Sequence, residues 1–75
     1  MAHPVGPPLC RPLEAGIWEV RTSLPSRKEV RLICCHNGAL DAIIVLHAFV
    51  KKRQKTDRAD IDLALRRKKE FEQEH

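Results

Sequence analysis

The middle of the chain alternates between apolar and polar residues with the two-residue period of a β-strand. Residues 17–24 and 29–35 show this alternation, and residues 42–50 form an apolar run rich in β-branched side chains. Residues 25–28 and the Asn37-Gly38 pair have the composition of turns and separate the three segments. The pattern predicts an antiparallel meander of three strands.

The two turns predict how these strands pair. Asn37-Gly38 is expected to form a two-residue type I′ turn, in which both central residues adopt positive φ. A four-residue loop at residues 25–28 would place Arg21 opposite Leu32, with Arg31 on the other face. A single β-bulge would reverse any of these assignments. The residues expected to share one face are Arg21, Ile43, Val45 and His47.

The last third of the chain has the pattern of a helix. Thr56 and Asp57 are good N-cap residues, and Asp60 follows Asp57 by three, as in a capping box. From there to about Glu72 an apolar stripe recurs at helical spacing. Its members are Ile61, Ala64, Leu65 and Phe71, with Lys68 in the same row. The predicted fold class is therefore α+β, a three-stranded antiparallel meander followed by a C-terminal helix.

The first sixteen residues differ from the rest in composition. They hold four of the five prolines and two of the three glycines. Because proline removes a backbone donor and disfavours helix in the residue before it, an extended, weakly ordered lead-in is expected over residues 1–16. Residues 17–75 are expected to form the folded core, and a chain of 75 residues has room for one small domain.

The positive charge is concentrated towards the C-terminus. Residues 1–50 carry five cations and four anions, whereas residues 51–75 carry nine cations and six anions. Lys51, Lys52, Arg53 and Lys55 follow the third predicted strand directly. Such a patch favours a polyanion, and without a glycine-rich phosphate loop nucleic acid is the first candidate. The alternative is a solvated loop that keeps a sheet edge soluble.

Cysteine usage and hydropathy bear on metal binding, on the cellular compartment and on membrane association. Cys34 and Cys35 are expected on opposite faces of a strand, so ordinary apolar packing is favoured over a zinc site with His36. No cofactor is expected. The odd cysteine count suits a reducing compartment, and no segment reaches the ~18 apolar residues of a membrane span. These features predict a cytoplasmic protein that does not engage a membrane.

His47 is the only histidine inside a predicted strand. A metal-free ribonuclease needs a base for the 2′-hydroxyl proton, cations around the scissile phosphate and an acid for the leaving 5′ oxygen. Nearby lysines favour the neutral imidazole that a base requires, and arginine offers a forked, permanent charge. The residues of these types are His47, Lys51, Lys52, Arg21 and Arg31. The alternative is a core histidine with a satisfied hydrogen bond.

Several stretches, in order, resemble the RelE/ParE toxin superfamily. They are Arg11-Pro12-Leu13, GIWEVR at residues 16–21, Val30-Arg31-Leu32, LHAFVKKRQKT at residues 46–56, and an acidic-start helix with Ile61, Ala64 and Arg67. The resemblance is to the phage-derived, HigB-like branch, where a pattern like LWELR … RV … LHGFVKKTQKTP recurs. It covers roughly residues 11–72, and the HxFxKKxQKT segment is its most specific part.

The resemblance implies a small twisted sheet packed by helices, and the toxin of a type II toxin–antitoxin pair. Such toxins often cleave mRNA on the ribosome without a metal, and a helix-turn-helix antitoxin covers their basic site. The catalytic residues that it implies are His47, Lys51 and Lys52. The RNA- or phosphate-binding residues that it implies are Arg21, Arg31, Gln54 and Lys55.

The chain also departs from the family pattern. A strand and two helices usually precede the segment matched by Arg11-Pro12-Leu13, so a truncated RelE-like fold is expected. Trp18 and Val20 would then be exposed, which favours a homodimer. The chain has no tyrosine, whereas some RNA-cutting relatives place one at the site, and Phe71 cannot exchange a proton. Two alternatives to cleavage follow: a non-catalytic fragment that binds antitoxin or RNA, and a ParE-like gyrase inhibitor.

Overall fold

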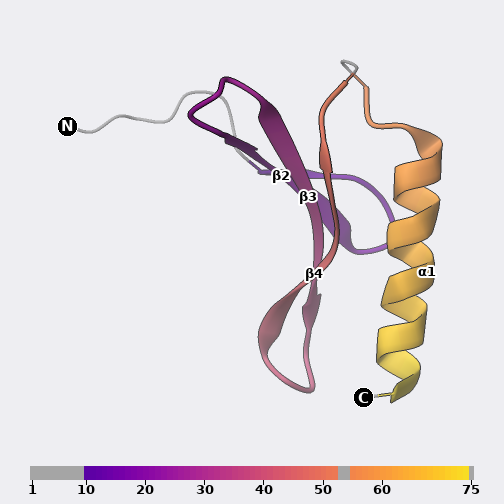
Figure 1. The fold of residues 1–75 in the computed structure, drawn as a ribbon. Coiled ribbons are helices and arrows are strands. Elements are labelled where there is room, and N and C mark those ends of the chain that lie inside the picture. Colours follow the sequence, from indigo (N-terminus) through magenta and orange to yellow (C-terminus); the bar gives the residue numbers. More distant parts are fainter. Residues whose placement is uncertain (1–9, 53–54, 75) are drawn as a thin grey trace.

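The computed structural model describes residues 10–52 and 55–74. In this part of the chain, four strands form one antiparallel sheet in the order β1-β2-β3-β4. They are β1 (Cys10–Pro12), β2 (Ile17–Ser23), β3 (Glu29–Asn37) and β4 (Ala42–Val50), and the helix α1 (Arg58–Glu74) follows them. The helix lies along one face of the twisted sheet (Figure 1). The fold is α+β, but the predicted three-stranded meander is wrong, because β1 adds a fourth strand.

The additional strand, β1, comes from the proline-rich start. It pairs with β2, placing Cys10 opposite Val20 and Pro12 opposite Trp18. Proline is tolerated there because β1 is an edge strand with a neighbour on one side only. A tight turn then returns the chain to β2, with Gly16 at φ 80°. Residues 1–9 of the predicted lead-in lie outside the described residues.

The turn between β2 and β3 is one residue shorter than predicted. Leu24 N donates to Lys28 O at 2.8 Å, and Arg27 N donates to Leu24 O at 2.9 Å. Arg27 has φ 70°, so the loop is a three-residue type with one left-handed residue. This shift places Arg21 opposite Arg31 rather than Leu32, and the predicted register is wrong here.

The turn between β3 and β4 is longer than predicted. Asn37 pairs with Ala42, and the Asn37 Oδ1 accepts a hydrogen bond from Leu40 N at 2.9 Å. The positive φ of this loop falls on Asp41, so the predicted type I′ turn at Asn37-Gly38 is wrong. The asparagine side chain instead stabilises a four-residue loop.

A bulge in β4 sets which side chains face the helix. Ile33 pairs with His47 but Cys34 pairs with Val45, so Leu46 is the extra residue. Arg21, Arg31 and Phe49 lie directly opposite one another across three strands, and His47 shares their face. Ile43 and Val45 lie on the other face. Two predictions are therefore wrong: that Arg31 faces away from His47, and that Ile43 and Val45 lie on the same face as His47.

The core lies between the helix and this face of the sheet. The buried cluster consists of Ile17, Ile33, Cys35, Leu46 and Ala64. Ile61 and Leu65 pack against it, which confirms this part of the predicted helical stripe. Asp57 O accepts hydrogen bonds from Asp60 N at 3.1 Å and Ile61 N at 3.3 Å, so Asp57 is the N-cap, as predicted.

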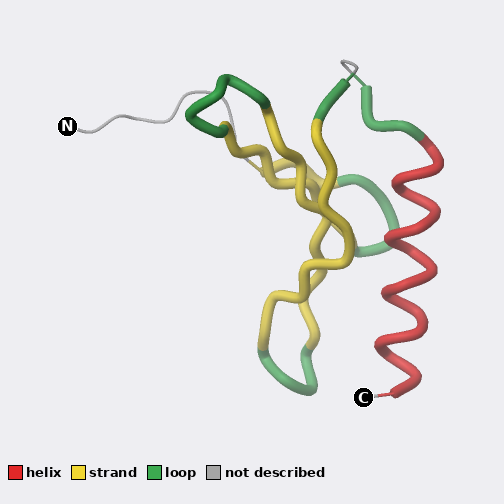
Figure 2. Tube along the Cα trace, in the orientation of Figure 1, coloured by secondary structure: helices red, strands yellow, loops and turns green. Residues whose placement is uncertain are grey.

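The other face of the sheet is apolar and partly exposed. Ile43 is 57% exposed and Val45 is 56% exposed, while Trp18 and Val20 are half-buried. No element of the described chain covers this face (Figure 1). The β3–β4 turn lies near the C-terminal end of α1, whereas the end of β4 and the start of α1 lie at the opposite end of the molecule (Figure 2). The candidate site lies at that second end.

Candidate nucleic-acid interface

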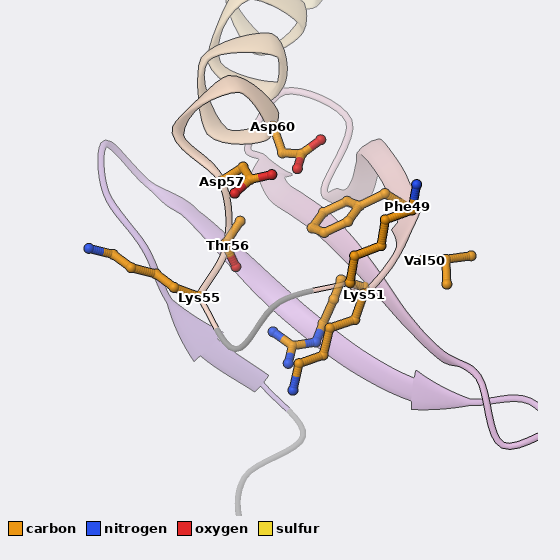
Figure 3. A pocket seen from close by; sticks show the side chains of 9 residues that line it. Phe49, Val50, Lys51, Lys55, Thr56, Asp57 and Asp60 are labelled. Carbon is orange, nitrogen blue, oxygen red and sulfur yellow. The ribbon is translucent and has the colours of Figure 1, made fainter.

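A hollow of about 450 Å³ lies where β4 ends and α1 begins. The residues that line it are Arg31, Phe49, Val50, Lys51, Lys52, Lys55, Thr56, Asp57 and Asp60. Figure 3 shows the Asp57 and Asp60 side chains close together at the start of the helix, and the Lys55 side chain extending away from Phe49. The structure thus brings four of the predicted site residues, Arg31, Lys51, Lys52 and Lys55, to one concave surface.

Arg31 is held at this hollow by two carboxylates, of which Glu19 is buried and Glu29 is half-buried. Its Nη1 donates to Glu19 Oε1 at 2.7 Å, and its Nε donates to Glu29 Oε2 at 2.6 Å. The Arg31 and Glu19 side chains are 4% and 1% exposed. Thr56 Oγ1 donates to the second oxygen of Glu19. One carboxylate therefore ties β3 to the loop that leads into α1, and it fixes one wall of the hollow.

Lys51 is anchored by its backbone and leaves its side chain at the hollow. Lys51 N donates to Glu29 O at 2.8 Å, and its Nζ lies 3.9 Å from Glu29 Oε2. The hydrogen bond from Arg31 is the main reason that the pKa of Glu29 is lowered from its usual value of 4.5. Lys52 and Lys55 are exposed, so their charges face solvent. The buried, ion-paired Arg31 comes from β3, whereas the exposed Lys52 and Lys55 come from the segment between β4 and α1.

His47 lies beside this hollow rather than within its lining. Its Nε2 is 2.8 Å from Asp60 Oδ1, and its ring stacks on Phe49 with a centroid separation of 5.3 Å. The His47 side chain is 15% exposed. Asp60 and Phe49 both line the hollow. His47 therefore connects to the cationic surface through its two neighbours.

The other predicted residues have different placements. Arg21 lines an adjoining hollow together with Arg31 and Lys51. Gln54 falls outside the described residues. Within residues 10–52 and 55–74, no three His, Cys, Asp or Glu side chains lie close enough to hold a metal ion. Cys34 and Cys35 are both buried, and burial raises the pKa of each thiol, as expected of packing residues.

Comparison with known proteins identifies the family. The model of the family described as phage-derived protein Gp49-like (DUF891) matches residues 1–69. The chain belongs to this family. No curated protein sequence matches the chain significantly. No solved structure matches it either.

Membership of the Gp49-like family agrees with the predicted resemblance to phage-derived, RelE-like toxins at the level of the family. It gives no support to the narrower HigB-like branch. No helix in the described part of this Gp49-like protein is long and apolar enough to cross a bilayer.

Sequence reasoning missed several residues that shape the site of this Gp49-like protein. Glu19, Phe49 and Asp60 were not assigned to it, and Thr56 was assigned only to helix capping. A signal for Glu19 exists, since it lies two residues after the apolar Ile17 and so shares its face of the strand. Its partner could not be found that way, because the pairing depends on the β2–β3 register.

Proposed function

We propose that this Gp49-like protein is the toxin of a toxin–antitoxin pair and a metal-free mRNA endonuclease of the HigB-like type. The observation that carries the proposal is that four cations line one hollow together with Phe49 and with Asp60, whose carboxylate bonds to His47. Cations and an aromatic ring in one concavity suit a phosphodiester and its base. A proton-accepting pair beside this hollow suits transfer of the 2′-hydroxyl proton.

The reaction would use the substrate's own 2′-hydroxyl. Its proton passes to the His47–Asp60 pair as the 2′ oxygen attacks phosphorus. The bond from phosphorus to the 5′ oxygen breaks, and an ammonium group of Lys51 or Lys52 supplies the proton that this oxygen takes up. The products are a 2′,3′-cyclic phosphate and a 5′-hydroxyl. Arg31, Lys51 and Lys52 would stabilise the charge that develops on the phosphate oxygens.

The partners proposed are mRNA on the ribosome and a helix-turn-helix antitoxin. An antitoxin that covers the hollow would meet the exposed cations Lys52 and Lys55. Acidic side chains on the antitoxin would complement them, which favours fast and specific association.

Controlled expression tests the function. The parent should halt translation, and the RNA ends made in cells should carry 2′,3′-cyclic phosphates and 5′-hydroxyls. Lys52→Ala and His47→Ala should each restore translation. Lys69→Ala is the matched control, because Lys69 is an exposed lysine on α1 outside the hollow. If both site variants stay as toxic as the parent, the assignment of chemistry to these residues is wrong.

A second candidate is a binder of RNA or antitoxin that does not cleave. The observation that favours it is that His47 is largely buried and absent from the residues that line the hollow. In that case Lys52→Ala should weaken RNA binding, while the purified parent should leave ribosome-bound mRNA uncut. Recovery of cyclic phosphate ends from the parent alone would refute this candidate.

A further inference from the structure

A second cationic hollow adjoins the first. Its volume is about 380 Å³, and it is lined by Cys10, Arg11, Pro12, Glu19, Arg21, Arg31 and Lys51. Arg31 and Lys51 line both hollows, so the two surfaces are continuous across these side chains. The second hollow extends the concave surface from the end of β4 to the β1 edge of the sheet.

The charged side chains that line the second hollow are mainly positive. Four cations line it together with one carboxylate, Glu19. That carboxylate is buried and already accepts hydrogen bonds from Arg31 at 2.7 Å and from Arg11 at 3.2 Å. The Arg11 side chain is 56% exposed, so most of its surface remains in contact with solvent. An anion that enters this hollow therefore meets guanidinium groups and little exposed negative charge.

We infer that one single strand of RNA runs through both hollows, with phosphates on each side of the Arg31–Lys51 wall. This inference rests on the proposed function and names its substrate class: a strand of several nucleotides, and not a mononucleotide or dinucleotide. Arg11 and Arg21 hold the phosphate beyond the cleavage site. Phe49, in the first hollow, offers an aromatic surface to a base. A cationic groove with an aromatic platform is the usual arrangement for binding single strands.

Strand β1 forms one wall of the second hollow. Strand β1 pairs with β2 at the edge of the sheet and places Arg11 opposite Glu19. Arg21 lies on β2 as well, two residues after Glu19. Without β1 the second hollow would lose Cys10, Arg11 and Pro12, and with them one wall. Strand β1 is therefore part of the proposed RNA-binding surface.

Binding measurements with uncleavable RNA test the inference. The probes are 2′-O-methyl oligonucleotides, a dinucleotide and a single strand of about eight nucleotides. The longer strand should bind the intact protein at least about tenfold more tightly, the effect of one added charge-assisted hydrogen bond. Arg11→Ala should remove most of this gain and reduce the salt dependence of log Kd by about 0.7. It should change the affinity for the dinucleotide much less than the affinity for the longer strand.

Two further variants control the comparison. Arg66→Ala removes an exposed arginine on α1 outside both hollows and should not change either affinity. Circular dichroism shows whether Arg11→Ala is folded. Arg21→Ala should have the same effect on RNA binding, and it replaces Arg11→Ala in the comparison if that variant is unfolded. Equal affinities for the short and long probes, unchanged in both variants, would overturn the inference and leave the proposed function standing. If neither probe binds the intact protein, the inference also fails, and the RNA ends made in cells test the proposed function separately.

Discussion

The guanidinium of Arg31 and the carboxylate of Glu19 form an ion pair of 2.7 Å in which both side chains are almost completely buried. The pair joins β2 to β3, and the second Glu19 oxygen accepts from Thr56 in front of α1. A predicted phosphate ligand is thus also a structural residue. Its position is set by the fold before any substrate arrives, which is the preorganisation that electrostatic catalysis requires.

Loss of the Glu19 charge should destabilise the protein strongly. In Glu19→Gln the buried Arg31 keeps its charge but loses its buried counterion, and breaking such a pair costs about 3 kcal/mol or more. Urea unfolding measures the change. Glu72→Gln is the control, because it breaks the surface pair with Lys68 and should cost less than about 0.5 kcal/mol. Similar losses in the two variants would contradict the structural role of Glu19.

Some elements of the fold can be predicted from short stretches of sequence, and others cannot. The alternation that begins at Ile17 and the N-cap at Asp57 follow from neighbouring residues, and the structure has both. The strand at residues 10–12 was missed because three residues carry no detectable period. Its pairing with β2 is a tertiary contact that composition does not encode.

The residue types at the site could be predicted from the sequence, but their arrangement in space could not. The cations Lys51 and Lys52 follow a strand in sequence, and the structure places them at one hollow. The face of Arg31 was predicted incorrectly because the β2–β3 loop has one residue fewer than expected. The bulge at Leu46 changed the faces again within β4. Each of these is a one-residue effect, and each inverts the side of the sheet on which a side chain lies.

Replacement of Arg27 by glycine should stabilise the fold. Arg27 holds φ 70° in the β2–β3 loop, a conformation that costs a residue with a Cβ about 1 kcal/mol. Arg27→Gly should raise Tm by about 4 °C in a domain of this size. Lys28→Gly, at the neighbouring position, should lower Tm, because it adds backbone freedom with no strain to relieve. A lower Tm in Arg27→Gly would contradict the assigned loop type.

Stability should fall in acid through two paired glutamates. The pKa of Glu14 is lowered mainly by its hydrogen bond from Arg58, and the pKa of Glu29 mainly by that from Arg31. Since each folded-state pKa lies below the unfolded value near 4.5, the stabilisation is complete above that pH. It is lost as pH falls through the lower, folded-state pKa.

Urea midpoints measured from pH 7 down to pH 3 test this expectation. Glu29→Gln should be less stable than the parent at pH 7 and should depend less on pH below 5. Glu70→Gln matches the change in net charge at an exposed position of α1. If the acid slope of Glu29→Gln equals that of the parent, the pairing with Arg31 contributes nothing in solution.

The uncovered face of the sheet should limit solubility. Val45 and Ile43 are more than half exposed on strand β4. Val45→Lys places a charge in the middle of this apolar surface and should raise the concentration at which the protein precipitates. Ala59→Lys adds the same charge at an exposed position of α1 and should have a smaller effect. Equal gains in the two variants would mean that net charge, and not the apolar face, governs solubility.

The bond between His47 and Asp60 should matter more for cleavage than for binding. Asp60→Asn keeps the shape of the side chain but removes the charge that orients the imidazole 2.8 Å away. Loss of an acid–base group typically slows a reaction about 100-fold or more, so single-turnover cleavage should fall by that factor. RNA affinity should stay the same or rise, because a carboxylate has left a cationic hollow. Asp62→Asn is the matched control, since Asp62 is an exposed aspartate on the same helix that bonds to Arg58. A parallel loss of binding and cleavage in Asp60→Asn would assign the pair to the fold and not to the chemistry.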